Sequence, residues 1–588
     1  MEKRTLIAVI LIMLVLGVNQ VVFNRYMHAR RKSAPPAAAP PMGAGTGTGA
    51  PTAGAPAAGS TGGSTGGPPP TQGGTPTPDQ AVTPGVSPAS LARVRVAPEP
   101  LVERTLHGDG FAVTFTSDGG SVHHWVLDHF RDPVLRTPRI DLVPEDRRAV
   151  QLVVGTSRGQ FDFSSVRFAL AESDTAKGVI AFAARDSSGL RVEKRYRLSG
   201  RAALLDLDVV IEAPPELGPL TYRLGWGVPL PITERTTRER DHQAVAYLGQ
   251  KLVTAPTYAL GKGKTEPRVE NGNVRWAGQR TRYFVAAVIP DSATVPSVAV
   301  DYAGWRFPAD HDLAIDGSRD VSAATTWLAG GAPPGTRLER HALIYAGPIE
   351  YEQLAPLGVG LETIANLGWK WMVPVSVLLL RLLHLLYKLI PNYGIAIIIL
   401  SAATKLLFYP LTQSSLRSMK VMHRLQPEVN QLRERYKDDP AKMNQAMMSL
   451  YKENKVNPLG GCLPMVLQIP VFIALYNVLF FSVELRAAPF FGYLQDLSAP
   501  DVFWRYGAFG LHLMPIAMTL SSYLLQSQTP VDPRQKATMY LMPLIMLVFM
   551  YSFPSGVVIY WTVNNLLSAL QQYLVNRAED RKLALEAA

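Results

Sequence analysis

One apolar stretch with a basic residue inside it decides the fold. Residues 393–412 read YGIAIIILSAATKLLFYPLT, and Lys405 is the one charged residue among them. Up to Tyr409 the stretch has the composition and roughly the length of a bilayer-spanning helix. A basic residue at the centre of such a helix costs roughly 2.5 to 3.5 kcal/mol, so Lys405 calls for a compensating polar environment. The alternative is that its side chain extends to the nearby membrane surface.

Other apolar segments extend this prediction to six spans. Residues 1–24 are interpreted as an uncleaved N-terminal transmembrane anchor, because the basic residues from 25 to 32 do not resemble a signal-peptide cleavage site. A cleaved signal peptide is the alternative. The other five predicted spans form a helical core over residues 393–576. They are residues 393–409, 459–482, 509–525, 539–553 and 556–575.

The distribution of basic residues predicts the orientation in the membrane. Residues 413–457 carry nine Lys or Arg, whereas residues 553–555, on the opposite side, carry none. Since Lys and Arg are retained on the cytoplasmic side, we expect the basic segment to be cytoplasmic. Both chain termini, including a short tail over residues 577–588, then lie in the cytoplasm.

Two helical segments outside the spans are also predicted. Residues 361–390 should form an amphipathic interfacial helix, because Arg381, His384 and Lys388 share one face of an otherwise apolar helix. Residues 413–457 should form a helical hairpin, because apolar seams lie on both sides of a breaker that ends at Pro440. The mixed charges of this hairpin fit either a plain solvated face or a docking surface for the ribosome, a nascent chain or lipid head groups.

The region between the anchor and the core changes its pattern twice. Residues 33–88 are mostly Pro, Gly, Ala, Thr and Ser, which predicts a disordered linker. Over residues 91–347 the period becomes two: apolar and charged residues alternate over residues 190–198, and a second alternation over 205–209 follows a Ser-Gly turn. Residues 111–115 repeat the pattern. We therefore expect an all-β sandwich domain, on the outer side of the membrane.

The composition of the whole chain excludes several classes of protein. The 588 residues are too many for a single small module. Only 18% are charged and 47% are hydrophobic, which argues against a dedicated nucleic-acid binder and against sequence-specific nucleic-acid recognition. The single cysteine, Cys462, excludes an intramolecular disulfide and a Cys-rich zinc site.

Three motif matches are interpreted as structural. Residues 155–159 match G-x-S-x-G, but a strand pattern follows where a serine hydrolase needs a helix, so we expect a hairpin turn. Residues 261–265 resemble the end of a phosphate-binding loop, but Tyr258 stands where its first glycine belongs, so we expect a flexible loop. The histidines around residues 123–129 have no second ligand cluster, so we expect no metal.

Polar side chains recur inside the predicted spans, in part at helical spacing. They can line one wet cavity together with Lys405, or they can only bond neighbouring helices to each other. No nucleophile, acid–base pair or metal-binding set accompanies them, so we expect no catalytic residue, metal or cofactor. One positive charge among neutral hydrogen-bonding groups suits a short acidic or polar peptide segment. The polar residues are Gln468, Asn477, Thr519, Ser522, Gln526, Tyr560, Asn564 and Ser568.

Several short motifs with characteristic residues lie along the predicted helical region. They are Tyr409-Pro410-Leu411-Thr412, Leu425-Gln426-Pro427, residues 457–462, residues 468–470, Val483-Glu484-Leu485-Arg486 and Phe553-Pro554-Ser555-Gly556. Over about residues 361–576 these motifs strongly resemble the YidC/Oxa/Alb family of membrane protein insertases. The anchor, linker and outer β domain match the Gram-negative arrangement of that family in layout.

The resemblance implies a non-enzymatic insertase and chaperone of the bacterial inner membrane, with the β domain in the periplasm. A cytoplasm-open hydrophilic groove would take the polar part of a nascent membrane protein while its apolar segment slides into lipid. The implied partners are nascent membrane proteins, the Sec translocon, the ribosome with the signal-recognition targeting machinery, and membrane lipids. The resemblance assigns to the groove Lys405, where the family has arginine, together with Ser401, Gln468, Tyr560 and Trp561; it assigns Ile469 and Phe472 to the hydrophobic slide.

Two other functions remain as alternatives. A small-solute transporter could bind an anion at Lys405, although the paired discontinuous helices of an internal repeat are not visible in the sequence. A membrane-anchored periplasmic sugar-binding protein would carry its function in residues 91–347. The resemblance of that domain to sugar-binding proteins is one of fold alone.

Overall fold

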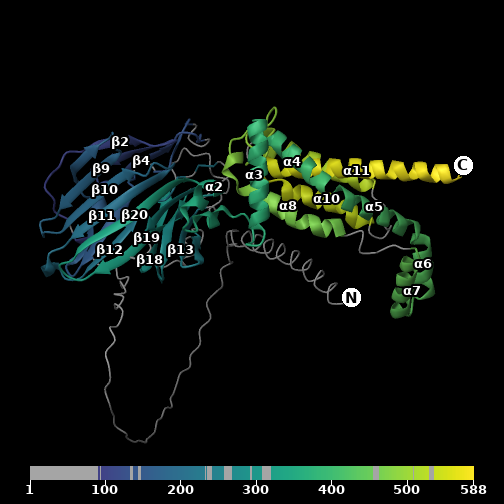
Figure 1. Ribbon diagram of the computed structural model, residues 1–588, viewed down its shortest axis with the longest axis horizontal. Helices are drawn as coiled ribbons and strands as arrows, with labels where there is room; N and C mark the ends of the chain where they lie inside the picture. The colour runs from purple at the N-terminus through teal and green to yellow at the C-terminus, as the bar shows by residue number, and fades with distance from the viewer. Residues whose placement is uncertain are drawn as a thin grey trace, which may run out of the picture. The chain divides into compact units, whose positions relative to one another are not determined.

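The chain folds into a strand-rich domain followed by a helical region (Figure 1). The computed structural model describes residues 91–587, apart from residues 93, 133–136, 144–146, 232, 235–241, 257–267, 292–294, 307–319, 455–462, 507–508 and 529–535. The predicted anchor over 1–24, the linker over 33–88 and the loop at 261–265 therefore lie outside the described residues.

Three sheets build the strand-rich domain. The nine-stranded sheet has the order β14 (Lys251–Pro256), β13 (Gln243–Leu248), β16 (Val274–Arg280), β17 (Phe284–Pro290), β20 (Arg337–Pro348), β11 (Leu204–Glu212), β10 (Arg191–Leu198), β9 (Val179–Arg185), β8 (Ala169–Asp174). The seven-stranded sheet has the order β1 (Leu91–Ala92), β7 (Gly159–Asp162), β6 (Gln151–Thr156), β12 (Leu220–Gly225), β19 (Asp320–Ala332), β18 (Ser297–Arg306), β15 (Arg268–Asn271). A smaller sheet pairs β2 (Glu103–His107), β3 (Phe111–Thr116), β4 (Ser121–Leu127) and β5 (Ile140–Asp141). Between β2 and β20 the described helical turns are the 3-10 turns η1 (Phe163–Ser165) and η2 (Pro215–Leu217), so the prediction of an all-β domain is confirmed.

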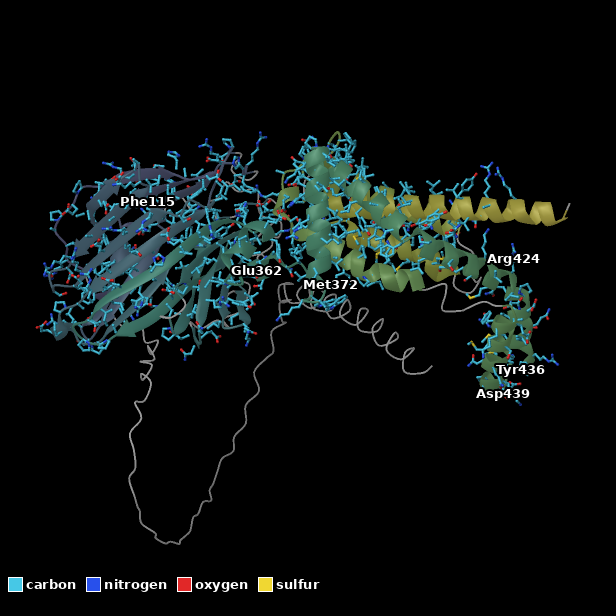
Figure 2. All side chains as sticks on the ribbon, in the orientation of Figure 1. Phe115, Glu362, Met372, Arg424, Tyr436 and Asp439 are labelled. Atoms are coloured by element: carbon cyan, nitrogen blue, oxygen red, sulfur yellow. The ribbon has the colours of Figure 1, made fainter. Side chains whose placement is uncertain are left out.

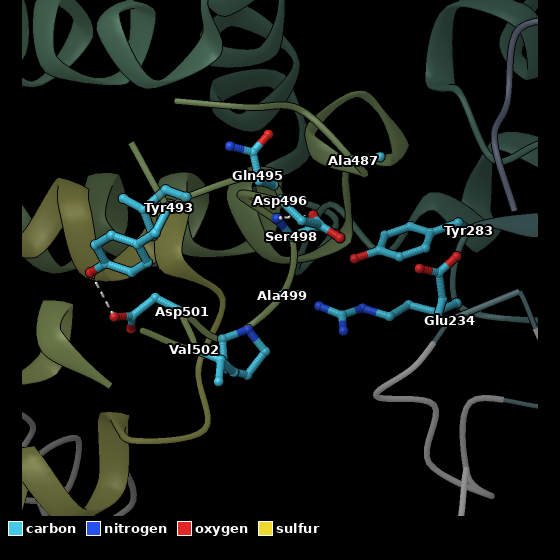
Figure 3. Close-up of a pocket in the computed structure, with 13 residues that line it drawn as sticks. Glu234, Tyr283, Ala487, Tyr493, Gln495, Asp496, Ser498, Ala499, Asp501 and Val502 are labelled. Carbon is cyan, nitrogen blue, oxygen red and sulfur yellow. Dashed lines mark hydrogen bonds between the residues drawn. The ribbon is translucent and has the colours of Figure 1, made fainter. Parts of the chain in front are cut away.

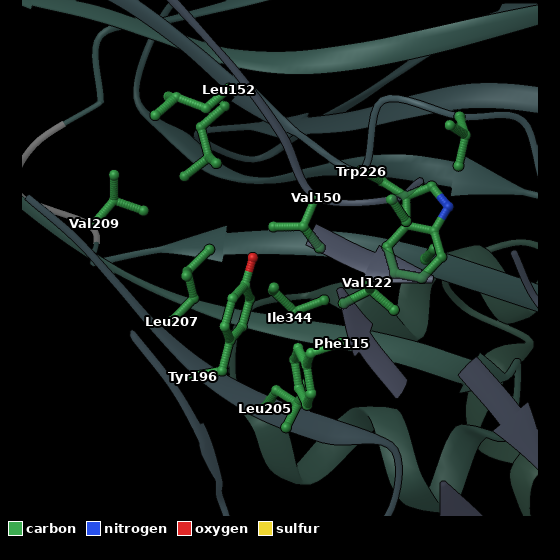
Figure 4. Close-up of a cluster of buried hydrophobic side chains, with 14 of the residues drawn as sticks. Phe115, Val122, Val150, Leu152, Tyr196, Leu205, Leu207, Val209, Trp226 and Ile344 are labelled. Carbon is green, nitrogen blue, oxygen red and sulfur yellow. The ribbon is translucent and has the colours of Figure 1, made fainter. Parts of the chain in front are cut away.

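The predicted hairpins lie where the alternation places them. Strands β10 and β11 pair antiparallel with Tyr196 opposite Leu207, and both side chains are fully buried. Together with Leu152 of β6 and Phe115 of β3 they form the core between the sheets (Figure 4). The G-x-S-x-G segment is the turn between β6 and β7, in which Thr156 pairs with Gly159. The predicted hairpin turn is confirmed, and no nucleophile elbow forms.

Lys194 breaks the apolar pattern on the buried face of β10. Its side chain is fully buried, and its Nζ donates to the carbonyl oxygens of Gly119 at 2.8 Å and Val150 at 2.9 Å. The Tyr196 hydroxyl donates to the neighbouring Gly120 carbonyl at 2.7 Å. These two side chains satisfy two carbonyls of the turn between β3 and β4 and the carbonyl of Val150, which precedes β6, as buried carbonyl groups require. Burial lowers the pKa of Lys194 to about 7.

Replacing Lys194 by methionine is expected to remove a rise in β-domain stability between about pH 7 and pH 10. Over this window the unfolded wild-type chain keeps the lysine proton whereas the folded chain has lost it, so its free energy of unfolding rises with pH. The methionine also leaves two buried carbonyls without a donor, at about 1–3 kcal/mol each. Urea unfolding of the full chain, followed by tryptophan fluorescence at both ends of the window, measures both effects. Lys251→Met, at an exposed position, should keep the rise; a rise that survives Lys194→Met contradicts the assignment.

The helical region follows β20 and contains ten described α-helices and one small hairpin of strands. The helices are α2 (Tyr351–Leu354), α3 (Val373–Leu389), α4 (Tyr393–Leu407), α5 (Tyr409–Arg424), α6 (Gln426–Arg435), α7 (Pro440–Glu453), α8 (Leu463–Phe481), α9 (Leu513–Ser527), α10 (Lys536–Met550) and α11 (Ser555–Ala587), and the strands are β21 (Trp504–Tyr506) and β22 (Phe509–Leu511). Helix α11 packs against α4, α8 and α9.

The expected segments differ from these helices at three places. The amphipathic segment 361–390 is divided into a 3-10 turn, η6 (Leu361–Ala365), and α3, because Asn366 and Gly368 have positive φ angles of 52° and 101°. The predicted span 509–525 is wrong at its start, since residues 509–511 pair with β21 and α9 begins only at Leu513. The expected tail after residue 576 continues α11 to Ala587.

One bent pair of described helices has the length and composition of a membrane span. Among the described residues, no helix on its own is long and apolar enough to cross a membrane; α4 and the first part of α5 meet the criterion only together, with a 61° bend between them. The bend follows from Pro410, which has no N–H to donate to the preceding turn. The count of six spans therefore stays a prediction.

Helices α6 and α7 form the predicted hairpin of helices. They pack against each other, and Leu425 and Val429 of the first apolar seam are buried. Asp439 caps α7, accepting from the Lys442 N–H at 3.0 Å. In Figure 2, Tyr436 and Asp439 mark the turn, at the end of the pair away from Arg424. The cytoplasmic location of this hairpin stays a prediction.

Candidate functional site

Lys405 joins two helices in the apolar part of the helical region. Its Nζ donates to the Ser568 hydroxyl of α11 at 2.6 Å, and this hydroxyl donates in turn to the Asn564 carbonyl oxygen at 2.6 Å. Helix α4 begins at the Asn392 cap, whose side chain accepts from the Ile395 N–H, and it ends two residues after Lys405. The negative end of the helix dipole therefore lies beside the ammonium group and stabilises it. Lys405 is half-buried, and its contact with Ser568 holds it against α11.

Helix α11 supplies the polar side of the site. Tyr560, Asn564 and Ser568 are spaced four apart and share one face, as predicted. A second polar face begins with Asn565, whose Nδ2 donates to the hydroxyls of Ser521 at 3.1 Å and Ser522 at 2.8 Å on α9. Gln571 donates to the Thr412 hydroxyl of α5 at 3.1 Å, and Gln572 to the Gln528 carbonyl at 2.8 Å. Polar contacts of α11 thus reach three neighbouring helices and the residue that follows α9.

Several predicted groove residues satisfy their hydrogen bonds locally. The Ser401 hydroxyl donates to the Ile397 carbonyl oxygen at 2.6 Å, and the Thr519 hydroxyl donates to the Pro515 carbonyl oxygen at 2.8 Å. Both side chains are buried. Asn477 lies nine residues from Gln468 along α8 and packs against Gly368, where a Cβ atom would come within 2.8 Å of its Nδ2. The structure thus joins Lys405 to Ser568 directly and gives Asn477 a packing contact elsewhere.

Aromatic side chains connect α8 to α11 next to these polar groups. Phe472 lies 4.9 Å from Trp561, edge to face, and 6.3 Å from Tyr560. Gln468 lies near enough to the buried Tyr560 hydroxyl to interact with it, although the geometry falls short of a regular hydrogen bond. Ile469 is exposed, whereas Phe472 is half-buried between the two aromatic residues. Of the two predicted slide residues, Ile469 is therefore the one with an open surface.

The predicted groove lacks four residues whose polar contacts the structure shows, namely Asn565, Ser521, Gln571 and Gln572. Asn565 stands directly after the predicted Asn564, and one residue turns a helix by about 100°, which moves the side chain to another neighbour. The signal was available in the spacing of Asn565 and Gln572, which are seven residues apart and lie on one stripe.

The histidines near residue 123 pair with carboxylates instead of converging on a metal. His123 Nδ1 lies 2.6 Å from Glu103, and His124 Nδ1 lies 2.6 Å from Asp141. Within the described parts of the chain, no three His, Cys, Asp or Glu side chains are grouped so that they could hold a metal ion.

Comparison with known proteins places the chain in a family. The model of the 60Kd inner membrane protein family matches residues 385–582, and that of the YidC periplasmic domain matches residues 104–376. The membrane protein insertase YidC of Syntrophus aciditrophicus (strain SB) is 33% identical over 481 residues, which cover 79% of this chain and 83% of that protein. The chain belongs to the YidC family of membrane protein insertases. The YidC insertase of Geobacter metallireducens is 32% identical over 520 residues, which cover 86% of this chain and 91% of that protein.

YidC membership confirms the resemblance that the motifs carry. The strand-rich region matches the YidC periplasmic domain, and the helical region matches an inner membrane protein family, as expected. One solved structure that resembles the chain is the crystal structure of an active YidC insertase with its first transmembrane domain resolved. The sequence identity is 18%, the match covers 82% of this chain and 95% of the crystallised chain, and the TM-score is 0.34.

Proposed function

We propose that this chain is a membrane protein insertase that inserts and helps fold nascent inner-membrane proteins. The YidC relatives support this function, because the chain aligns with more than four fifths of their length. The structural observation that carries it is the contact between Lys405 Nζ and the Ser568 hydroxyl, because it places a cation and a row of polar groups inside apolar helices. Such an arrangement suits the temporary binding of a polar peptide segment.

The mechanism we infer is partition. Lys405 and the polar face of α11 replace part of the hydration that a polar segment loses on leaving water. The apolar segment of the client moves past Ile469 into lipid, and its transfer out of water supplies the driving force. The membrane potential assists acidic segments that move outward, by about 2.3 kcal/mol per charge per 100 mV. We assign the groove to the residues predicted above, with Asn565 and Ser521 added from the structure.

We extend the proposal to topology and partners. The anchor over 1–24 and five core helices would give six spans, with both termini and the basic hairpin over 413–457 in the cytoplasm. This hairpin would meet the nascent chain first. The Sec translocon, the ribosome and the signal-recognition targeting machinery are the partners that the family resemblance implies.

Reconstitution tests the proposed function. The full chain in proteoliposomes should insert a small single-span or double-span protein, measured by protease protection, well above protein-free liposomes. A version that lacks residues 91–347 should retain insertion if the helical region carries the function. No insertion of several such clients by the full chain would reject the proposal. Loss only on deletion of the β domain would favour a function in that domain.

A further inference from the structure

A cavity of about 570 Å³ lies between the β domain and the segment that follows α8 (Figure 3). The β domain contributes Glu234, Arg282 and Tyr283, and the segment over residues 487–502 contributes Asp496, Ser498 and Asp501, among others. The proposed insertion mechanism uses none of these residues. Their charges and unused hydrogen-bonding groups indicate a ligand that carries both signs of charge.

The acceptor side of the cavity is formed by Asp496 and Tyr283. One carboxylate oxygen of Asp496, Oδ1, accepts from the Ser498 N–H at 2.8 Å and its hydroxyl at 2.7 Å. The Tyr283 side chain is 1% exposed, and its hydroxyl lies near enough to Ser498 to interact with it, although the geometry falls short of a regular hydrogen bond. Figure 3 shows this hydroxyl directed toward Ser498 and Asp496. A buried hydroxyl that points into a cavity beside a carboxylate calls for a partner.

The carboxylates of Glu234 and Asp496 repel each other electrostatically. Burial is the main cause that raises the pKa of Glu234, to about 7, and Asp496 raises it further, against the opposing effect of Arg486. Asp496 also contributes to a raised pKa at Tyr283, mainly a result of burial. A cation between Asp496 and Tyr283 would relieve this repulsion. Asp501 has a structural role. Its Oδ2 accepts from the Leu513 and Met514 N–H groups at 2.7 and 2.9 Å and so caps α9.

Arg282 supplies the opposite charge in the same cavity. Its Nη2 donates to the Phe480 carbonyl oxygen at 2.9 Å, and its guanidinium lies 4.3 Å from the centre of the Phe480 ring. Its Nε is buried and has no hydrogen-bond partner in the described structure. A guanidinium with unused donors is well suited to a phosphate group.

Exposed aromatic residues stand close in sequence to the cavity residues Tyr493 and Val502. Phe491, Phe503 and Trp504 are 60%, 54% and 55% exposed, and Phe503 packs on the cavity residue Tyr493 at 5.2 Å. Trp and other aromatic side chains of inner membrane proteins concentrate where lipid head groups meet the hydrocarbon. These exposed aromatic side chains favour a lipid over a soluble peptide as the source of the ligand.

We propose that this cavity binds the head group of a zwitterionic phospholipid with a primary ammonium group. The ammonium lies between Asp496 and the Tyr283 hydroxyl, and the phosphate lies next to Arg282. A primary ammonium has three N–H donors for these acceptors, whereas a trimethylammonium group has none. The proposal goes beyond membrane protein insertion and depends on no residue of the Lys405 site.

Titration of the full chain in detergent with short-chain lipids tests the proposal. Native mass spectrometry should show dihexanoyl phosphatidylethanolamine bound at least about tenfold more tightly than dihexanoyl phosphatidylcholine. Asp496→Asn should weaken the binding of the ethanolamine lipid about tenfold, and Tyr283→Phe about threefold. Asp109→Asn, which removes an exposed carboxylate elsewhere in the β domain, is the matched control and should bind as the wild type does.

Three outcomes would overturn the proposal. Equal affinity for the two lipids shows that the ammonium is not recognised. Wild-type affinity in both folded variants, with unchanged melting curves, places the lipid elsewhere. A lysine-containing peptide that displaces the lipid and binds more tightly makes a client segment the occupant instead. Tyr283→Phe removes a single oxygen, so it keeps the test decisive if Asp496→Asn does not fold.

Discussion

Lys405→Glu is expected to lower insertion of a client with an acidic translocated segment at least about tenfold, which corresponds to about 1.4 kcal/mol. Three physical effects act in the same direction. The substitution removes the donor of the 2.6 Å bond to the Ser568 hydroxyl. It places a carboxylate in the last turn of α4, where the helix dipole repels it. It also reverses the one charge of α4 that an acidic segment would meet.

Matched variants separate charge from fold in this assay. Lys405→Arg keeps the charge and should retain most of the insertion, because arginine stays protonated in any environment. Lys388→Glu makes the same reversal at an exposed position of α3 and should have little effect. A neutral client should lose less than an acidic one. If Lys405→Glu inserts both clients as the wild type does, the charge is dispensable and the neutral polar groups of α11 must suffice.

The parts of the fold that the sequence predicted are those governed by local periodicity. Alternation over residues 190–209 places Tyr196 and Leu207 on one buried face, because a strand turns its side chains with a period of two. Lys405 stood out because a charge within an apolar helix needs a polar partner. The partner, Ser568, could be placed on the right face of its helix from the four-residue spacing alone.

The parts that the sequence did not predict depend on contacts between distant segments. Asn565, and not its neighbour Asn564, donates a side-chain hydrogen bond to α9. This choice depends on how α11 is rotated against its neighbours, and tertiary packing sets that rotation. Residues 509–511 are apolar enough for a span, yet they pair with β21 and end the strand hairpin before α9 begins. The cavity around Tyr283 joins residues more than 200 positions apart, so no window of sequence reveals it.

Arg486→Ala is expected to lower the free energy of unfolding by about 3–5 kcal/mol at neutral or higher pH. Arg486 follows α8, and its side chain is 1% exposed against 8% for its partner Glu234 in the β domain. Its Nε donates to the Glu234 carboxylate, and its two other nitrogens donate to the carbonyl oxygens of Arg131 at 2.7 Å and Thr233 at 2.9 Å. Alanine removes all three bonds and leaves a buried carboxylate without its counter-charge, which is the costly way to break a buried ion pair.

The pH dependence of the Arg486→Ala defect distinguishes a lost counter-charge from lost packing. Burial already raises the pKa of Glu234 to about 7 against the opposing effect of Arg486, and without Arg486 the folded chain should hold this proton to still higher pH. A folded pKa above that of the unfolded chain means that stability falls as pH rises through the interval between the two values. The defect should therefore be smaller near pH 5 than near pH 8, because only the loss of the counter-charge depends on pH, whereas the bonds to the two carbonyl oxygens are lost at both values.

Denaturation of the full chain at both pH values measures this difference, with Arg381→Ala as the matched control. Arg381 pairs with Glu352 at 3.5 Å, but both side chains are at least half exposed, so its loss should cost about 0–1 kcal/mol at either pH. Adding Glu234→Gln to Arg486→Ala removes the stranded carboxylate and should recover part of the stability at pH 8, as coupled neighbours do in a double-mutant cycle. An equal defect at both pH values, with no recovery in the double variant, would mean that Arg486 acts through its contact with the Phe284 ring and its bonds to carbonyl oxygens, and not as the counter-charge of Glu234.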